Sequence, residues 1–185
     1  AFFLYEAIPK QTLYFAGDQI WTQGQGKYTS HWLPSIDDMN EKMEFDLTII
    51  SPSEKTTIAN GKLVSTVKRE NKTYWKWDMQ QPMSSYLVAF AMGDFEKKSV
   101  SSKSGIPIEL YYKPDDSSKV EPTYRYTQQL FDFMEAEIGV PFPWQNYKEV
   151  PVRDFLYAGM ENTSATFFSE AFVVDSIGFS DRNYV

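Results

Sequence analysis

Alternation between apolar and polar side chains constrains the first two thirds of this chain to β-structure. Residues 43–49 and 73–79 both alternate in this way, and a period of two is typical of a strand with one buried face. The segments 60–61 and 70–72 lie between such runs and carry turn residues, so we expect hairpin turns there. The nearly continuous apolar run 85–93 predicts a strand covered on both faces. Short strands at this spacing predict an antiparallel sandwich or a saddle-shaped sheet.

A change of composition after Lys97 divides the chain. Residues 99–105 are small and polar, which is typical of a boundary between structural units. We therefore expect one unit over residues 1–100 and a second over residues 101–185. The second unit is short for a core of its own, so we expect it to pack on the first.

The second unit reads as strands around a helix. Residues 106–112, 148–155 and 165–168 are strand-like. Apolar residues between 126 and 138 recur at helical spacing, and Gly139 is a natural helix stop. The expected fold class is mainly β with a smaller α+β part: an antiparallel saddle-like or sandwich-like unit followed by β-α-β elements.

Composition excludes several functions. The 185 residues include 18 Lys and Arg against 25 Asp and Glu, a formal net charge of −7, so nucleic acid and anionic membranes are poor partners. No apolar run approaches the ~20 residues that span a bilayer. Cysteine is absent and His31 is the single histidine, so we expect no metal bound by these residues. The compartment stays open, because a cysteine-free chain suits either redox environment.

The segment around Glu161 is the most informative candidate site. Ala158-Gly159 is a small pair that lets another backbone approach closely, and an extended edge there could accept a peptide by strand addition. The Glu161 carboxylate, one step further along, could bind a ligand ammonium. The alternative is a glycine turn with a solvated Glu161, and the residues alone favour that alternative.

Two further features allow two interpretations each. Gln23 and Gln25 would place two amides on one face of an extended segment, but a solvated glycine-rich loop is the commoner outcome. Trp75 and Trp77 share one strand face and could stack a sugar, whereas packing in the core is far more frequent.

Four segments in order resemble the M1 family of zinc aminopeptidases, the family of aminopeptidase N. Residues 158–162, Ala-Gly-Met-Glu-Asn, resemble its Gly-x-Met-Glu-Asn exopeptidase motif. Residues 32–38 are similar to its Pro-x-x-Asp stretch, and residues 82–95 to its Met-Ser-Thr-Tyr-Leu-Val-Ala-Phe segment. Residues 138–143 resemble the Gly-Ile-Pro-Tyr-Pro that precedes the motif.

The resemblance implies a fold and a site. It implies a β-saddle amino-terminal domain followed by the start of a thermolysin-like catalytic domain. Glu161 would bind the free α-amine of a peptide, and residues 158–160 would line the edge that holds its backbone. Gln25 and Tyr157 would border the pocket for the amine and the first side chain. The substrate-binding residues implied are Gln25, Tyr157, Ala158, Gly159, Met160, Glu161 and Asn162.

The sequence also departs from the family pattern. The first motif position is Ala158 rather than glycine, and the zinc motif His-Glu-x-x-His is absent. In the family that motif supplies two zinc ligands and the general base, and it lies downstream of the region that ends at Val185. The resemblance therefore implies a fragment of a zinc aminopeptidase that recognises a free peptide amino terminus.

Such a fragment would contain no catalytic residue or metal ligand and would be inactive by itself. Zinc would belong to the parent enzyme, and the rest of the catalytic domain would be a partner of this piece. The alternative is a non-catalytic scaffold of the same family that acts as a protein-interaction module. An intact His-Glu-x-x-His downstream would exclude it.

Overall fold

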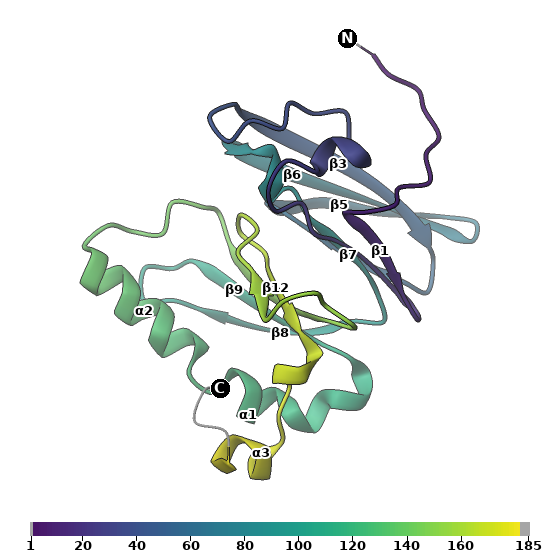
Figure 1. Ribbon diagram of the computed structural model, residues 1–185. Coiled ribbons are helices and arrows are strands. Elements are labelled where there is room, and N and C mark those ends of the chain that lie inside the picture. The colour runs from purple at the N-terminus through teal and green to yellow at the C-terminus, as the bar shows by residue number, and fades with distance from the viewer. Residues whose placement is uncertain (1, 182–185) are drawn as a thin grey trace.

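The computed structural model describes residues 2–181 and arranges them as three β-sheets with helices on one side (Figure 1). The two sheets of the amino-terminal part lie together, and the third sheet lies between them and the helices. The helices are α1 (Val120–Tyr124), α2 (Thr127–Ile138) and α3 (Ser176–Asp181), with 3₁₀ turns at η1 (Thr29–His31), η2 (Ser85–Leu87), η3 (Pro114–Lys119) and η4 (Glu170–Phe172). No helix among residues 2–181 is both long and apolar enough to cross a membrane.

The three-stranded sheet follows the alternating pattern directly. Its order is β3 (Lys42–Pro52), β6 (Lys72–Ser84) and β5 (Lys62–Arg69), all antiparallel. The strands predicted over 43–49 and 73–79 are therefore confirmed, and Leu47 lies opposite Trp77. The turn predicted at 70–72 is also confirmed, because Arg69 pairs with Lys72 across a two-residue hairpin.

The two tryptophans of β6 do not form a sugar platform. Trp77 is only 1% exposed, and Trp75 is half-buried and donates its indole N–H to Ser51 Oγ at 3.0 Å. Packing in the core is the interpretation that the structure supports.

The hairpin expected at 60–61 was wrong. The four-stranded sheet has the order β1 (Leu13–Ala16), β2 (Gln19–Thr22), β7 (Phe90–Gly93) and β4 (Thr56–Ala59). The strand before Gly61 thus pairs in that sheet, while β5 after it pairs with β6. Residues 60–61 therefore form a corner between two sheets. The turn residues correctly indicated a change of chain direction there, but they do not determine which strands pair.

The continuous strand expected over 85–93 was wrong as well. Residues 85–87 form a 3₁₀ turn and β7 begins only at Phe90. Val88 and Ala89 between them are completely buried, so burial explains the apolar run without a strand. Ser85 Oγ donates to the Ile36 carbonyl at 3.0 Å, which helps to hold the turn.

The third sheet contains the predicted β-α-β unit. Its order is β11 (Gly159–Met160), β12 (Thr166–Ser169), β10 (Tyr147–Val152), β9 (Pro107–Tyr112) and β8 (Glu96–Ser101). The strands β9 and β10 are parallel and are joined through α1 and α2. The α2 helix ends as predicted at Gly139, which has φ +70° and donates its N–H to the Glu135 carbonyl at 3.0 Å.

One hydrophobic core joins the two parts of the chain. Trp21 and Ile58 of the amino-terminal sheet pack in the same cluster as Val150 and Phe167 of the third sheet. The Trp21 indole N–H also donates to the carbonyl of Arg153 at 2.9 Å. The boundary predicted at residue 100 falls within β8, which pairs with β9 across it, and the domain limits stay a prediction.

Candidate substrate-binding edge

The segment that carries Ala158-Gly159 is an edge strand. Gly159 and Met160 pair antiparallel with Phe168 and Phe167, and the Ser169 N–H donates to the Ala158 carbonyl at 3.0 Å. The strand β11 is the last in its sheet, and no strand of residues 2–181 pairs with its other side. Such an edge presents unpaired backbone groups, which can pair with an extended peptide.

Side chains of this segment divide between core and surface. Met160 is buried in the shared core, whereas Tyr157, Ala158, Gly159 and Glu161 are exposed. Among residues 2–181, no side chain forms a hydrogen bond or an ion pair with the Glu161 carboxylate. The structure thus places a free carboxylate at the end of an open sheet edge.

Gln25 reaches the same place from the amino-terminal part. The Gln23 amide donates to the Met160 sulfur at 3.7 Å and to the Gln25 side-chain oxygen at 3.3 Å. The Gln25 backbone N–H donates back to the Gln23 side-chain oxygen at 3.3 Å. Gln25 itself is exposed. The buried Gln23 is therefore the link that brings Gln25 to the edge strand.

Asn162 lies beneath the edge rather than on it. It is buried, and neither atom of its side-chain amide has a hydrogen-bond partner among the described residues. A buried unpaired amide costs about 1–3 kcal/mol, so this side chain is a place where a further donor or acceptor would be stabilising. Its backbone carbonyl accepts from the Ala165 N–H at 2.9 Å, which closes a tight turn over residues 162–165.

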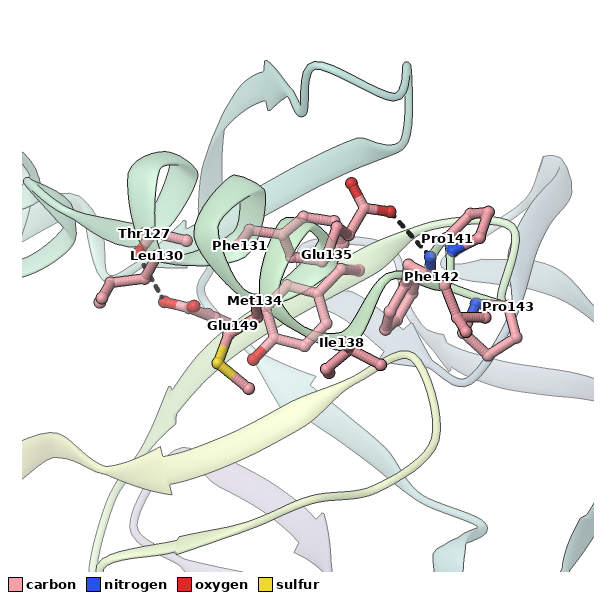
Figure 2. A pocket seen from close by; sticks show the side chains of 12 residues that line it. Thr127, Leu130, Phe131, Met134, Glu135, Ile138, Pro141, Phe142, Pro143 and Glu149 are labelled. Carbon is pink, nitrogen blue, oxygen red and sulfur yellow. Dashed lines mark hydrogen bonds between the residues drawn. The ribbon is translucent and has the colours of Figure 1, made fainter.

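A hollow of about 480 Å³ lies between α2 and the segment 140–143 (Figure 2). Its walls are mostly apolar. The polar residues of the lining are Thr127, Glu135, Tyr147 and Glu149, and the Glu149 carboxylate accepts from the Thr127 hydroxyl at 3.2 Å. A neighbouring hollow of about 340 Å³ shares Glu149 and extends to Ala158. Burial raises the pKa of the Glu149 carboxyl to about 7, against the smaller opposing effect of the Thr127 hydrogen bond.

Lys148 is a fully buried charged residue and Glu149 a half-buried one, and sequence reasoning missed both. They are adjacent on β10 and so face opposite sides of the sheet. Lys148 points into the contact with the amino-terminal part, and Glu149 towards α2. Two charges within a strand covered on both sides were the available signal, because such charges are rarely buried without a specific environment.

The described residues do not fit a zinc site. Within residues 2–181, no group of three or more His, Cys, Asp or Glu side chains is close enough to hold a metal ion. The only histidine, His31, has its ring nitrogens near the Tyr28 carbonyl and the Gln11 amide. No step through zinc is therefore assigned to these residues.

Comparison with known proteins agrees with this arrangement. Residues 8–87 match the sequence model described as the peptidase M1 N-terminal domain, and residues 123–183 match that of the peptidase family M1 domain. The chain belongs to the M1 peptidase family. The second match covers the Ala-Gly-Met-Glu-Asn motif at 158–162, and the predicted family and fold class are confirmed.

Relatives of this M1 chain include two aminopeptidases. Glutamyl aminopeptidase of Rattus norvegicus is 27% identical over 140 residues, which make up 74% of this chain. Endoplasmic reticulum aminopeptidase 1 of Homo sapiens is 30% identical over 139 residues, or 75% of this chain. The chain spans about 15% of the length of these relatives.

Proposed function

We propose that this M1 chain supplies the site that recognises the peptide amino terminus in a zinc aminopeptidase, an enzyme that removes amino-terminal residues from peptides. The observation that carries the proposal is the open edge of β11, which ends at the exposed and unpaired carboxylate of Glu161. The M1 membership of the chain and the names of its relatives support the same activity.

In this proposal the chain's own residues bind and orient the substrate. The backbone of residues 158–160 pairs with the peptide main chain, and Glu161 receives the α-ammonium group. Gln25 and Tyr157 border the space for the amine and the first side chain, and Asn162 supports the edge from below. A charge-assisted hydrogen bond of this kind contributes about 1.5–3 kcal/mol, so a free amino terminus would be preferred over a blocked one.

Zinc would polarise the scissile carbonyl and activate water in the whole protein. Its ligands would come from residues other than those described here, because the described chain offers no cluster that fits the metal. The remainder of the catalytic domain would then be a partner of this chain. Exposed apolar side chains on α2, such as Leu130 and Ile138, support a packing surface there.

The Glu161→Gln variant tests the proposal in the protein as its gene encodes it. We expect kcat/KM for a chromogenic aminoacyl amide to fall by about 10- to 100-fold, the loss of one charge-assisted bond, with the zinc content unchanged. Glu54→Gln, an exposed glutamate in the turn before β4, is the matched control and should keep normal rates.

Two outcomes contradict the proposal. Near-normal rates in Glu161→Gln would remove the amine-binding role. A zinc-free and inactive wild-type protein that still binds other proteins would support the non-catalytic scaffold instead.

A further inference from the structure

The turn that follows Glu161 is held by the amino-terminal β-structure. The side-chain amide of Asn60 donates to the Thr163 carbonyl at 2.6 Å, and the Gly61 N–H donates to the Ser164 hydroxyl at 2.7 Å. Both bonds join residues 103 positions apart in the sequence. The corner between β4 and β5 thus reaches across to the turn at 162–165.

The side-chain amide of Asn60 is held by hydrogen bonds at both its nitrogen and its oxygen. Its amide nitrogen also donates to the Leu87 carbonyl at 2.9 Å, and its amide oxygen accepts from the Ala89 N–H at 2.6 Å. The residue is 2% exposed. Each of its donors and its acceptor therefore has a partner, and a buried network that is fully satisfied holds one geometry.

The turn itself has an unfavourable backbone. Ser164 adopts φ +60°, a left-handed conformation that costs a residue with a side chain about 1–2 kcal/mol. The Ser164 hydroxyl is the group that accepts the Gly61 N–H, and both residues are buried. The hydrogen bond from Gly61 to the Ser164 hydroxyl offsets this backbone cost. Breaking it would leave the buried Gly61 N–H without a partner, which costs more than an ordinary lost hydrogen bond.

The corner is tied to the third sheet a second time. The Gly61 carbonyl accepts from the Lys148 ammonium of β10 at 2.5 Å. Gly61 is consequently bonded through its N–H to the turn and through its carbonyl to the central strand of the same sheet. This double attachment fixes where the turn lies relative to β10.

We infer that Asn60 and Gly61 are positioning residues for Glu161, so that the amino-terminal β-structure takes part in peptide recognition without touching the peptide. The inference rests on the proposed role of Glu161 in binding the amine. Glu161 has no side-chain partner of its own among the described residues, so its carboxylate is placed by the strand before it and the turn after it. The strand is held by β12 and the turn by Asn60 and Gly61.

Hydrogen exchange tests the positioning directly, without reference to activity. In Asn60→Asp the donors to Leu87 and Thr163 are lost while the acceptor for Ala89 is kept, and in Ser164→Ala only the bond to Gly61 is lost. We expect amides of residues 161–165 to exchange at least tenfold faster in both variants. Ser51→Ala is the matched control, since Ser51 is a buried serine whose hydroxyl bonds, among the described residues, to Pro52, Lys55 and Trp75 and not to the turn at 162–165.

The exchange result decides the structural half of the inference. Unchanged exchange at 161–165 in folded Ser164→Ala and Asn60→Asp would overturn it. If Asn60→Asp fails to fold, Ser164→Ala alone gives the decision, because it removes a single hydroxyl.

Kinetics test whether the positioning acts through Glu161. We expect Ser164→Ala to raise KM for a free-amine substrate at least threefold with a smaller change in kcat, and to add nothing further in the Glu161→Gln background. Independent, multiplied effects in the double variant would show that the turn acts elsewhere. If Glu161→Gln alone leaves kcat/KM unchanged, the amine-binding proposal fails, while the exchange measurement still reports on the positioning of the turn.

Discussion

The ammonium nitrogen of Lys148 lies 5.2 Å from the centre of the Trp77 ring, inside the contact between the third sheet and the amino-terminal part. Its hydrogen-bond acceptors are the Gly61 carbonyl and the Asn146 side-chain oxygen, both uncharged. Burial lowers the pKa of the Lys148 ammonium from 10.5 to about 7, against a smaller opposing effect of Glu109. No carboxylate of residues 2–181 forms an ion pair with this buried amine, so the stability of the interface depends on pH.

The Lys148→Met variant should lose that dependence. The folded state of the wild type binds fewer protons at Lys148 than the unfolded state between pH 7 and 10.5, so the free energy of unfolding rises with pH across this window. Methionine removes the rise and leaves the Gly61 carbonyl unpaired, a loss of about 1–3 kcal/mol. Urea unfolding should show the variant as the more stable protein at pH 6 and the less stable at pH 9. If the unfolding free energies of the wild type and the variant changed in parallel with pH, the assignment to Lys148 would be contradicted.

Glu149→Gln should change stability in a different pH window. The folded pKa of Glu149 is raised from 4.5 to about 7, so the folded state keeps a proton that the unfolded state releases. Stability therefore falls as pH rises through this interval. Glutamine still accepts from the Thr127 hydroxyl but has no proton to lose, so we expect it to stabilise the protein by about 1–2 kcal/mol at pH 8 and not at pH 4. The exposed Glu137 provides the control: Glu137→Gln should show no such difference.

Together, the two neighbours predict a minimum in the stability of the wild type. The contribution of Glu149 to the free energy of unfolding falls as pH rises to about 7, and the contribution of Lys148 rises from about pH 7 upwards. A profile of unfolding free energy from pH 4.5 to 10 should therefore dip near neutrality. The double variant should flatten the dip, and a dip of full depth in it would assign the effect to other groups.

Gly61→Ala and Gly139→Ala form a matched pair of backbone tests. Both glycines have positive φ, +72° and +70°, so both variants lose about 1–2 kcal/mol from the left-handed backbone. A Cβ at Gly61 would also lie 2.1 Å from the Asp78 carbonyl oxygen, whereas one at Gly139 would meet no atom within 4 Å. Gly61→Ala should be more destabilised by several kcal/mol in thermal or urea unfolding. Equal losses would show that the corner can relax.

Periodicity in the sequence predicted most elements, but not how they associate. The alternating runs became β3 and β6, and the helical spacing became α2 with its end at Gly139. Residues 60–61 and 85–93 were misjudged, because strand pairing and burial are decided by distant partners. An apolar run such as 88–89 is buried equally well in a loop as in a strand.

The candidate site was predictable where a short motif carried it. Glu161 and its neighbours stand in one recognisable segment, and the structure brings Gln25 to it through Gln23. Asn60 and Lys148 gave no such signal, because their importance lies in contacts 87 to 103 positions away. A buried lysine also looks like any surface lysine until the strand around it is known to be covered on both sides.

The strand β11 contains only two residues, and this short length limits how many main-chain contacts a bound peptide can make with it. A segment pairing with it would gain one or two main-chain hydrogen bonds and then pass beyond the edge. Such contacts are the same for every amino acid, so affinity from this edge would be modest and indifferent to side-chain identity. Selectivity among peptides would have to come from groups at its two ends.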